Sequence, residues 1–407
     1  MKITKEPRNS SMYALLTKVQ LSAFIFTFVL SFSGYSQSKE ASVTSIDGHI
    51  FQPTAVKATD ERVKNLKVPE GYKVEVFAKD LNQPRIIDVA DDGTVYLTRR
   101  EDFDLMMLKD TNGDGKADTQ KTIWKKDQLH GMDVDGDKIY LITVNKVYVA
   151  NRKADGSIDE PKMIIDGLPE AGQHPNRTLA VGPDNKLYVS VGSTCNACGE
   201  TSEKNATLLR ADKDGKNVEI YAKGLRNTIG FDWYPVTGEL YGMDHGIDWL
   251  GDEDQKEELN KLEEGNNYGW PYIYADSKYN PADKPPKMSY EAYAKKSTEP
   301  EFLLTAHAAP MEMVFYKGKM FPQKDKNSAF LALHGSWNRE KPVGYKVVKI
   351  VFEDGRPTGF EDFLTGFLVE NEKSQFGRPV GIAEHTDGSL LITDDSGGMV
   401  YRVSYKN

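Results

Sequence analysis

Imidazole and basic side chains recur at the start of short apolar segments along this 407-residue chain. In the stretch HPNRTLAVGPDNKLYVSVGS, His174 precedes an apolar segment at 178–181, and a Gly-Pro-Asp-Asn turn leads to a second segment at 187–191, followed by Ser193. This pattern predicts a β-hairpin, whose two outer ends lie side by side. A neutral imidazole at such an end can accept the proton of a substrate hydroxyl, so we predict that His174 is a general base.

The same arrangement, a polar start, an apolar strand, a turn and a second strand, recurs six times. Most repeats are spaced by the ~40–50 residues that are typical of one four-stranded propeller blade. We therefore predict an all-β fold, a six-bladed β-propeller, which brings the polar ends of every repeat to one rim of a central channel. A β-sandwich is the alternative, but it does not account for the repeat. The predicted rim residues are Gln83, Arg85, Arg99, His130, Asn145, His174, Ser193, Arg226, Asn227, Asp244, His245, His307, Trp337, Arg339, Arg378 and Asp394.

Two further patterns suggest ligands. Arg226, in GLRNTIGF, offers a planar fork of donors that suits carboxylate or quinone oxygens, whereas a salt bridge between blades is the alternative. The stretch DTNGDGKAD has the spacing of a calcium-binding loop, and a metal-free turn between outer strands is equally compatible with it. The candidate calcium ligands in this loop are Asp110, Asn112, Asp114 and Asp118.

Composition and termini restrict the compartment and the partners. The net charge of -9 argues against a nucleic-acid or anionic-membrane surface. A basic start, an apolar run at 21–32 that is too short to span a bilayer, and a small-residue cleavage site predict a signal peptide over 1–36; an uncleaved anchor is the alternative. The mature chain is then periplasmic or secreted, without a membrane span.

The domain organisation predicted from the sequence is a linker at 37–62 and one propeller domain at 63–407, with an insertion at about 272–300 that forms an extended surface loop. In an exported protein, Cys195 and Cys198 predict a small local disulfide. A zinc site is the alternative, but no further ligands are evident nearby.

With these motifs in view, residues 68–403 resemble the soluble quinoprotein sugar dehydrogenases, and more closely their sorbosone-dehydrogenase-like branch. The stretches that carry the resemblance are HPNRTLAVGPDNKLYVSVGS, GLRNTIGF, EGNNYGWP, LALHGSWNR and GRPVGIAEHTDGSLLITDD. The resemblance implies a six-bladed propeller that binds pyrroloquinoline quinone (PQQ) and calcium over the channel mouth and oxidises sugar hydroxyl or hemiacetal carbons.

Residue by residue, the resemblance makes His174 the catalytic base and Arg226 and Asn227 cofactor ligands. It also implies that Arg378 binds a cofactor carboxylate, and that the backbone carbonyls of Gly246 and Ile247 hold the calcium ion. Trp337 and Arg339 are further candidate cofactor contacts; Arg339 or Lys341 would replace a family lysine. The sequence departs from the soluble glucose dehydrogenases at Ser193, which stands in place of an acidic residue, at Val380 in place of a second arginine, and at Ile247 in place of a proline.

The leading functional hypothesis is therefore PQQ-dependent oxidation of a sugar or sugar aldehyde, with an unidentified electron acceptor. A calcium-dependent propeller lactonase or hydrolase and a non-catalytic binding propeller are the alternatives. Because Ser193 gives His174 no carboxylate partner, we expect activity to rise through the neutral-to-alkaline range as the imidazole loses its proton, unless another rim carboxylate such as Asp244 orients the ring.

Overall fold

The computed structural model describes residues 48–170, 172–281 and 283–406, and in this part of the chain it contains six four-stranded antiparallel sheets, numbered here in chain order of their innermost strands. Sheets 1 to 3 consist of β3 (Pro84–Val89), β4 (Val95–Arg99), β5 (Asp104–Lys109) and β6 (Thr119–Lys125); β7 (Gly131–Asp135), β8 (Lys138–Ile142), β9 (Lys146–Asn151) and β10 (Lys162–Asp166); and β11 (Thr178–Val181), β12 (Lys186–Val191), β13 (Thr207–Asp212) and β14 (Glu219–Lys223). Sheets 4 to 6 consist of β15 (Thr228–Trp233), β16 (Leu240–Asp244), β17 (Glu257–Leu262) and β20 (Phe302–Leu304); β21 (Pro310–Phe315), β22 (Ala329–Leu333), β23 (Lys346–Glu353) and β24 (Arg356–Leu364); and β27 (Pro379–Glu384), β28 (Leu390–Asp394), β29 (Met399–Tyr405) and β2 (Tyr72–Ala78).

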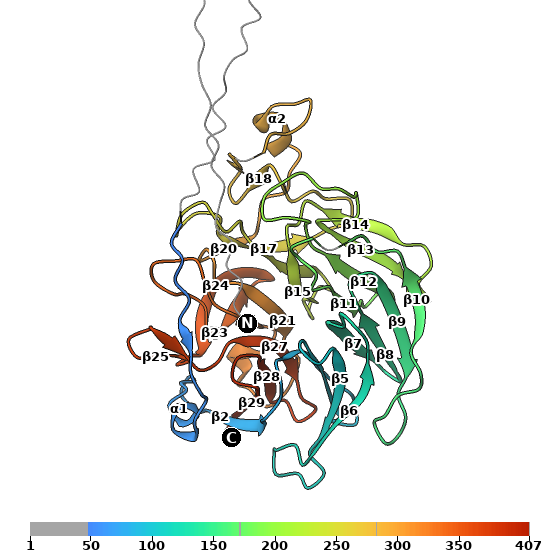
Figure 1. Cartoon of the computed structure of the whole chain (residues 1–407), viewed down its shortest axis with the longest axis vertical. Coiled ribbons are helices and arrows are strands. Elements are labelled where there is room, and N and C mark those ends of the chain that lie inside the picture. The colour runs from blue at the N-terminus through green and yellow to red at the C-terminus, as the bar shows by residue number, and fades with distance from the viewer. Residues whose placement is uncertain (1–47, 171, 282, 407) are drawn as a thin grey trace, which may run out of the picture. The chain divides into compact units, whose positions relative to one another are not determined.

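The innermost strands of the six sheets form a closed ring. Each contacts the innermost strand of the next sheet, in the order β3, β7, β11, β15, β21 and β27, and β27 returns to β3 (Figure 1). The ring closes with strands from both ends of the chain, because β2 pairs with β29 in the register Tyr72 to Tyr405. Sheet 6 is therefore complete only when β2, from the start of the domain, pairs with the last strand of the chain.

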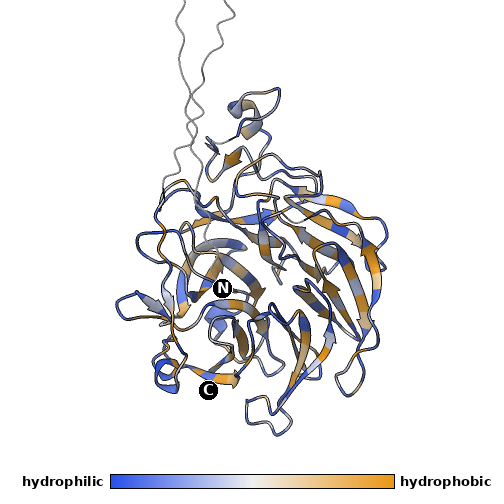
Figure 2. Cartoon of the chain, viewed as in Figure 1, coloured by the Kyte–Doolittle hydropathy of each residue, from blue (hydrophilic) through white to orange (hydrophobic). Residues whose placement is uncertain are grey.

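Apolar side chains fill the spaces between neighbouring sheets. Tyr316, Phe330 and Tyr401, each almost fully buried, belong to one cluster contributed by sheets 5 and 6, and comparable clusters join the other sheets. The strands of the sheets carry most of the hydrophobic residues and the connecting loops most of the hydrophilic ones (Figure 2). Several second strands, such as β16, β22 and β28, are buried at every position, because neighbouring sheets cover both of their faces.

A cavity of about 860 Å³ lies between the innermost strands, towards their C-terminal ends. Burial raises the pKa of Asp88 there to about 6 and that of Glu312 well above its ordinary value. Imidazole and guanidinium groups thus lie near the starts of most innermost strands and carboxyl groups lie further along them, so the two ends of the channel differ in chemical character. The carboxylates that line this cavity are those of Asp88, Asp91, Asp133, Asp135, Asp232, Glu312 and Glu384.

The segments outside the six sheets are more ordered than the sequence predicts. The insertion between β17 and β20, predicted as an extended loop, contains the hairpin of β18 (Ile273–Tyr274) and β19 (Lys278–Tyr279) and the helix α2 (Tyr290–Ala294). The described part of the predicted linker forms β1 (Thr54–Ala55), which pairs with β26 (Ser374–Gln375) next to β25 (Leu368–Val369), and helix α1 (Asp60–Lys64) begins within it. This part therefore packs against the sheets. A short 3₁₀ turn, η1 (Gln323–Asp325), precedes β22.

Two predictions concern the N-terminal region and the membrane. The predicted signal peptide at 1–36 lies outside the described residues. Within the described residues, the search for a helix with the length and apolar character needed to cross a bilayer found none.

The closure of the ring depends on a buried ion pair next to β2, and this gives a first prediction. Asp325 accepts hydrogen bonds from Lys349 Nζ and from the Tyr72 hydroxyl, both at 2.6 Å. Asp325→Ala leaves the buried ammonium group with only an exposed partner, so it should lower the free energy of unfolding by about 3 kcal/mol. Urea denaturation measures this. The control is Asp362→Ala, which breaks an exposed ion pair with Lys346 and should cost less than about 1 kcal/mol. Equal losses in the two variants would contradict the prediction.

Candidate functional site

His174 lies shortly before β11 and is held by Ser193, the second residue after β12. Its Nδ1 is 2.8 Å from the carbonyl oxygen and 2.9 Å from the hydroxyl oxygen of Ser193. Because the carbonyl can only accept, Nδ1 carries the proton; the hydroxyl in turn donates to the Cys195 carbonyl at 2.8 Å. Nε2 has no partner among the described residues and keeps its lone pair. The ring is thus presented in the tautomer that a base requires.

The protonation state of His174 differs from the expectation. Burial, followed by the positive charge of Arg226, lowers the pKa of His174 to about 3. The imidazole is therefore already neutral across the neutral range. The expected rise of activity with pH through that range does not follow from the titration of this group.

Asn227 approaches His174 across Gly192, at the end of β12. A Cβ on Gly192 would lie 2.6 Å from Asn227 Oδ1 and 2.8 Å from His174 Cβ, closer than non-bonded atoms can approach. The absence of a side chain at Gly192 therefore allows the predicted base and the predicted amide ligand, from sheets 3 and 4, to lie side by side.

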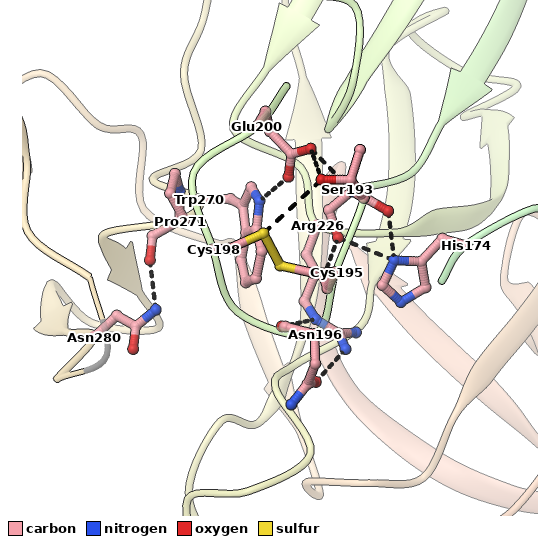
Figure 3. The surroundings of a disulfide bond; sticks show 11 residues. His174, Ser193, Cys195, Asn196, Cys198, Glu200, Arg226, Trp270, Pro271 and Asn280 are labelled. Carbon is pink, nitrogen blue, oxygen red and sulfur yellow. Dashed lines mark hydrogen bonds between the residues drawn. A yellow bond between two sulfur atoms is a disulfide. The ribbon is translucent and has the colours of Figure 1, made fainter. Parts of the chain in front are cut away.

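Arg226 precedes β15 and is held mainly by the loop that contains the two cysteines (Figure 3). Its Nε and Nη2 donate to the backbone and side-chain oxygens of Asn196 at 3.0 and 2.7 Å, and Nη2 lies 3.4 Å from Asp248. Its guanidinium group also stacks over the Trp270 ring at 5.7 Å. Nη1 has no partner among the described residues. The expected alternative, a salt bridge between blades, is not observed, because Asp248 follows β16 of the same sheet.

Asp244 does not orient the His174 ring. Its carboxylate accepts the backbone N–H groups of Arg226 and Asn227, both at 2.7 Å, and the Thr228 hydroxyl at 2.8 Å. Burial raises the pKa of Asp244 to about 6. The carboxylate thus shapes the backbone that carries two candidate ligands, and Ser193 is the partner of the imidazole.

Arg378, before β27, belongs to a second group of rim residues. Its Nε and Nη2 donate to the carbonyls of His334 and Gly335 at 3.0 and 2.9 Å, and its guanidinium group lies over the Tyr345 ring. Nη1 has no partner in the described part of the chain. Like Arg226, Arg378 is therefore held by carbonyl oxygens with one donor group unused.

His334 and Asp395 were not singled out from the sequence, although both lie within the motifs LALHGSWNR and LLITDD. His334 Nε2 is 2.9 and 3.0 Å from the two oxygens of Asp395, which also accepts from Arg85 at 2.6 Å. This is the histidine–carboxylate pair that His174 lacks. His130, the second histidine of the predicted rim, contacts the Arg177 carbonyl through Nδ1 and Arg85 through Nε2, so neither of its nitrogens is free.

The groups around His174 and His334 lie at the same end of the channel. Burial, followed by the positive charge of Arg226, lowers the pKa of His245 to about 3, and His174 and His334 lie close enough to interact with its ring. Burial and Arg378 lower the pKa of His334 to about 4, although Asp395 opposes this shift. Three neutral imidazoles and two guanidinium groups with unused donors therefore meet at this rim.

The two sets of predicted calcium ligands differ in whether their oxygens already have hydrogen-bond partners. Gly246 N donates to Glu257 and Ile247 N to Gln255, whereas neither carbonyl oxygen accepts a hydrogen bond from a described residue. In the loop at 110–118, side-chain oxygens bind N–H groups of the loop itself: Asp110 accepts from Gly113 and Gly115, both at 2.7 Å. Asn112, Asp114 and Asp118 make contacts of the same kind. Among the described residues, no group of three or more His, Cys, Asp or Glu is arranged to hold a metal ion.

Trp337 and Arg339, the remaining predicted cofactor contacts, occupy the loop after β22. Trp337 is 37% exposed and packs edge-to-face on Trp249, with ring centroids 5.1 Å apart. Arg339 donates to the carbonyls of Asp252 and Ala306 and to Glu253. Its guanidinium group therefore ties neighbouring loops together, and its role as a cofactor ligand stays a prediction. The predicted disulfide between Cys195 and Cys198 is confirmed.

Known proteins share both the sequence and the architecture. A Borreliella burgdorferi protein without an assigned function is 35% identical over 371 residues, which are 86% of this chain and 93% of that protein. The PQQ-dependent pyranose dehydrogenase of Coprinopsis cinerea is 35% identical over 124 residues, only 26% of this chain and 16% of that enzyme.

Solved structures resemble the whole ring. The holo PQQ domain of the Coprinopsis cinerea pyranose dehydrogenase covers 87% of this chain, and all of that domain is matched, with a TM-score of 0.72 and 21% identity. The calcium structure of the Trichoderma reesei enzyme of carbohydrate-active family AA12 covers 84% of this chain, and 97% of that chain is matched, with a TM-score of 0.73 and 20% identity. The ring of four-stranded sheets is thus the β-propeller that the sequence repeat predicts.

The family model that matches the sequence, described as TrAA12-like, covers residues 66–406. This span includes all six sheets and both groups of rim residues. The chain therefore belongs to the TrAA12-like family.

Proposed function

We propose that this chain is an exported, six-bladed propeller dehydrogenase that uses PQQ to oxidise a sugar or a sugar aldehyde. One observation carries the proposal. His174 is neutral and its Nε2 is free, and the same rim holds two guanidinium groups whose Nη1 atoms have no partner among the described residues. The relatives that bear PQQ and sugar dehydrogenase in their names support the cofactor and the substrate class. The sequence motifs support the sorbosone-dehydrogenase-like branch, hence a sugar aldehyde or its hydrate as substrate.

The donors at the rim fit an anionic quinone cofactor. PQQ is a tricarboxylate, and Arg226 and Arg378 each offer an unused guanidinium nitrogen for a charge-assisted hydrogen bond. Asn227 adds an amide beside His174. The histidines around them are neutral, so they do not compete with the arginines for the anion.

Calcium fits the loop that follows β16. Gly246 and Ile247 have carbonyl oxygens without hydrogen-bond partners among the described residues, and carbonyl oxygens are ligands that calcium prefers. The calcium structure of the Trichoderma reesei AA12 enzyme supports calcium as the ion. Side chains of the loop at 110–118 are committed to backbone N–H groups, so we place the cofactor's calcium ion at Gly246 and Ile247.

The chemistry divides between the cofactor and this chain. When bound, PQQ supplies the two-electron acceptor for a hydride from the substrate carbon. His174 Nε2 accepts the proton of the hydroxyl on that carbon, so that a carbonyl group forms. Ser193 fixes the tautomer and orientation of the ring, and Arg226 places positive charge where negative charge develops.

Cofactor capture gives a second prediction. Arg226→Ala and Arg378→Ala should each weaken PQQ binding by about 2 kcal/mol, roughly 30-fold in Kd, because each removes a charge-assisted contact. Absorbance or fluorescence titration of the calcium-loaded protein measures the Kd. The control is Arg210→Ala, which removes an arginine of sheet 3 that pairs with the surface carboxylates of Glu219 and Glu264. If both site variants bind like the parent, PQQ does not occupy this rim.

The base gives a third prediction. His174→Gln should reduce turnover by ~10²–10⁴ while leaving PQQ binding near the parent value, because the ring contributes a proton acceptor and little packing. His385→Gln, which changes a histidine paired with Asp387, is the matched control and should leave turnover unchanged. Parent turnover in His174→Gln would place the base elsewhere, and His334 would then be the next candidate.

The state of the base is also measurable, and gives a fourth prediction. With a pKa lowered to about 3, the His174 imidazole should stay neutral in the cofactor-free protein from pH 8 down to about pH 4. Histidine ¹⁵N chemical shifts, assigned by comparison with His174→Gln, report the protonation state directly. A midpoint near the ordinary histidine value of about 6.5 would contradict the burial and the influence of Arg226.

A further inference from the structure

We propose that the disulfide loop at 195–198 is a positioning element of this site, with Asn196 as the residue that orients Arg226. The inference rests on the proposed function, because it assigns Arg226 to the cofactor and His174 to the substrate. It adds a residue and a covalent bridge that touch neither ligand and act through these two side chains.

Asn196 contributes most of the hydrogen bonds that hold Arg226. Its backbone and side-chain oxygens accept Nε and Nη2 of Arg226 at 3.0 and 2.7 Å. The same side-chain oxygen accepts the backbone N–H of Asp248 at 3.1 Å. Asn196 thus holds one edge of the guanidinium group, through Nε and Nη2, and links it to the segment that carries the predicted calcium ligands.

The loop also holds His174. The Ser193 hydroxyl bridges His174 Nδ1, at 2.9 Å, and the Cys195 carbonyl, at 2.8 Å. Figure 3 shows these contacts close to the disulfide: Ser193 is joined to His174, and Asn196 is joined to Arg226. One short loop therefore sets the position of the base and of the arginine.

The loop is anchored at a further point by Glu200. One carboxylate oxygen accepts the backbone N–H and the hydroxyl of Thr194, at 2.9 and 3.0 Å, and the other accepts Trp270 Nε1 at 2.8 Å. Trp270 in turn underlies Arg226. The guanidinium group therefore lies between two structures, the disulfide loop and the indole ring, that are joined through Glu200.

The disulfide restricts the conformation of a loop that is only partly buried. Residues 194–198 are partly exposed, and this polar loop has no regular secondary structure. Closing the four-residue ring between Cys195 and Cys198 removes conformations that the open loop would sample. A side chain that is already ordered in the free protein binds its ligand more tightly, because binding then loses less conformational entropy.

The test compares three variants in the cofactor-free and PQQ-loaded protein. Cys195→Ser/Cys198→Ser opens the ring, Asn196→Ala removes the side-chain acceptor, and Asn196→Asp keeps an acceptor for Arg226. In the cofactor-free protein, ¹⁵N NMR should show the Arg226 Nη2 protons protected from exchange in the parent and in Asn196→Asp, and unprotected in Asn196→Ala and in the serine variant. The serine variant should also lose protection of Nε–H, whose acceptor is the backbone carbonyl of the loop. In the loaded protein, PQQ Kd should rise about tenfold or more in those two variants.

A second route covers poor folding of the serine variant. Folded parent protein is reduced with a phosphine, alkylated with iodoacetamide and freed of reagents before PQQ is added. It should show the same loss of Arg226 Nε–H protection and the same weaker binding, with an unchanged circular dichroism spectrum. Glu219→Gln, a conservative change at an exposed surface carboxylate, is the control and should match the parent in both readouts.

The outcomes separate this inference from the proposed function. If the parent binds no PQQ, the proposed function fails, and the Arg226 signal in the cofactor-free variants still decides the positioning role. If the parent binds PQQ and the opened loop keeps both the Arg226 signal and the parent Kd, the positioning role is overturned. A loss of thermal stability without a change in either readout would likewise make the disulfide a structural bridge only.

Discussion

The fold depends on hydrogen-bond partners for the backbone N–H groups on the channel side of each innermost strand. Such a strand pairs on one side only, so the N–H groups that face the channel have no strand partner, and leaving them unpaired inside the ring would cost free energy. Carboxylates from neighbouring sheets accept these groups. The pairs are Val134 N with Asp88, Val181 N with Asp133, Phe315 N with Asp232, and Ile382 N with Glu312. The channel carboxylates are therefore bonds between sheets, and their burial is what raises their pKa values.

At the opposite end of the strands, hydroxyl groups make the corresponding connections to carbonyls. Thr98 of β4 donates to the His130 carbonyl at 2.6 Å, and Thr393 of β28 donates to the Arg85 carbonyl at 2.5 Å. In each case a residue at the start of one innermost strand is held by the second strand of the preceding sheet. The rim therefore takes its geometry from contacts between sheets, and closure of the ring by β2 is a condition for the site.

The repeat made the architecture predictable, because polar ends and alternating strands recur in each sheet. It placed His174, Arg226 and Arg378 at one rim, where the structure also has them. The pairing of β2 with β29 was not predictable, since a lone strand near the N-terminus carries no signal of its distant partner. The hydrogen-bond partners of the rim residues could not be predicted either. They are largely backbone carbonyl groups, whose positions depend on the conformations of the loops.

The roles of single residues were the hardest feature to predict from the sequence, because they too depend on the local conformation of the backbone. Asp395 follows Asp394 directly, yet Asp394 accepts backbone N–H groups such as that of Arg378, whereas Asp395 pairs with His334 and Arg85. Two adjacent aspartates point to different partners because successive residues near a strand end face opposite sides. Sequence reasoning selected the first, and only coordinates distinguish them.

The charge of the rim also bears on the strength of the base. Arg226 has one weak carboxylate contact and Arg378 has none among the described residues, whereas Asp395 is shared between His334 and Arg85. The rim without a ligand is thus cationic, and part of the lowering of the His174 pKa comes from Arg226. An anion placed against Arg226 would offset that charge and raise the pKa of the imidazole, making it a stronger base. The charge of Arg226 is thus, after burial, the second influence on the proton affinity of His174.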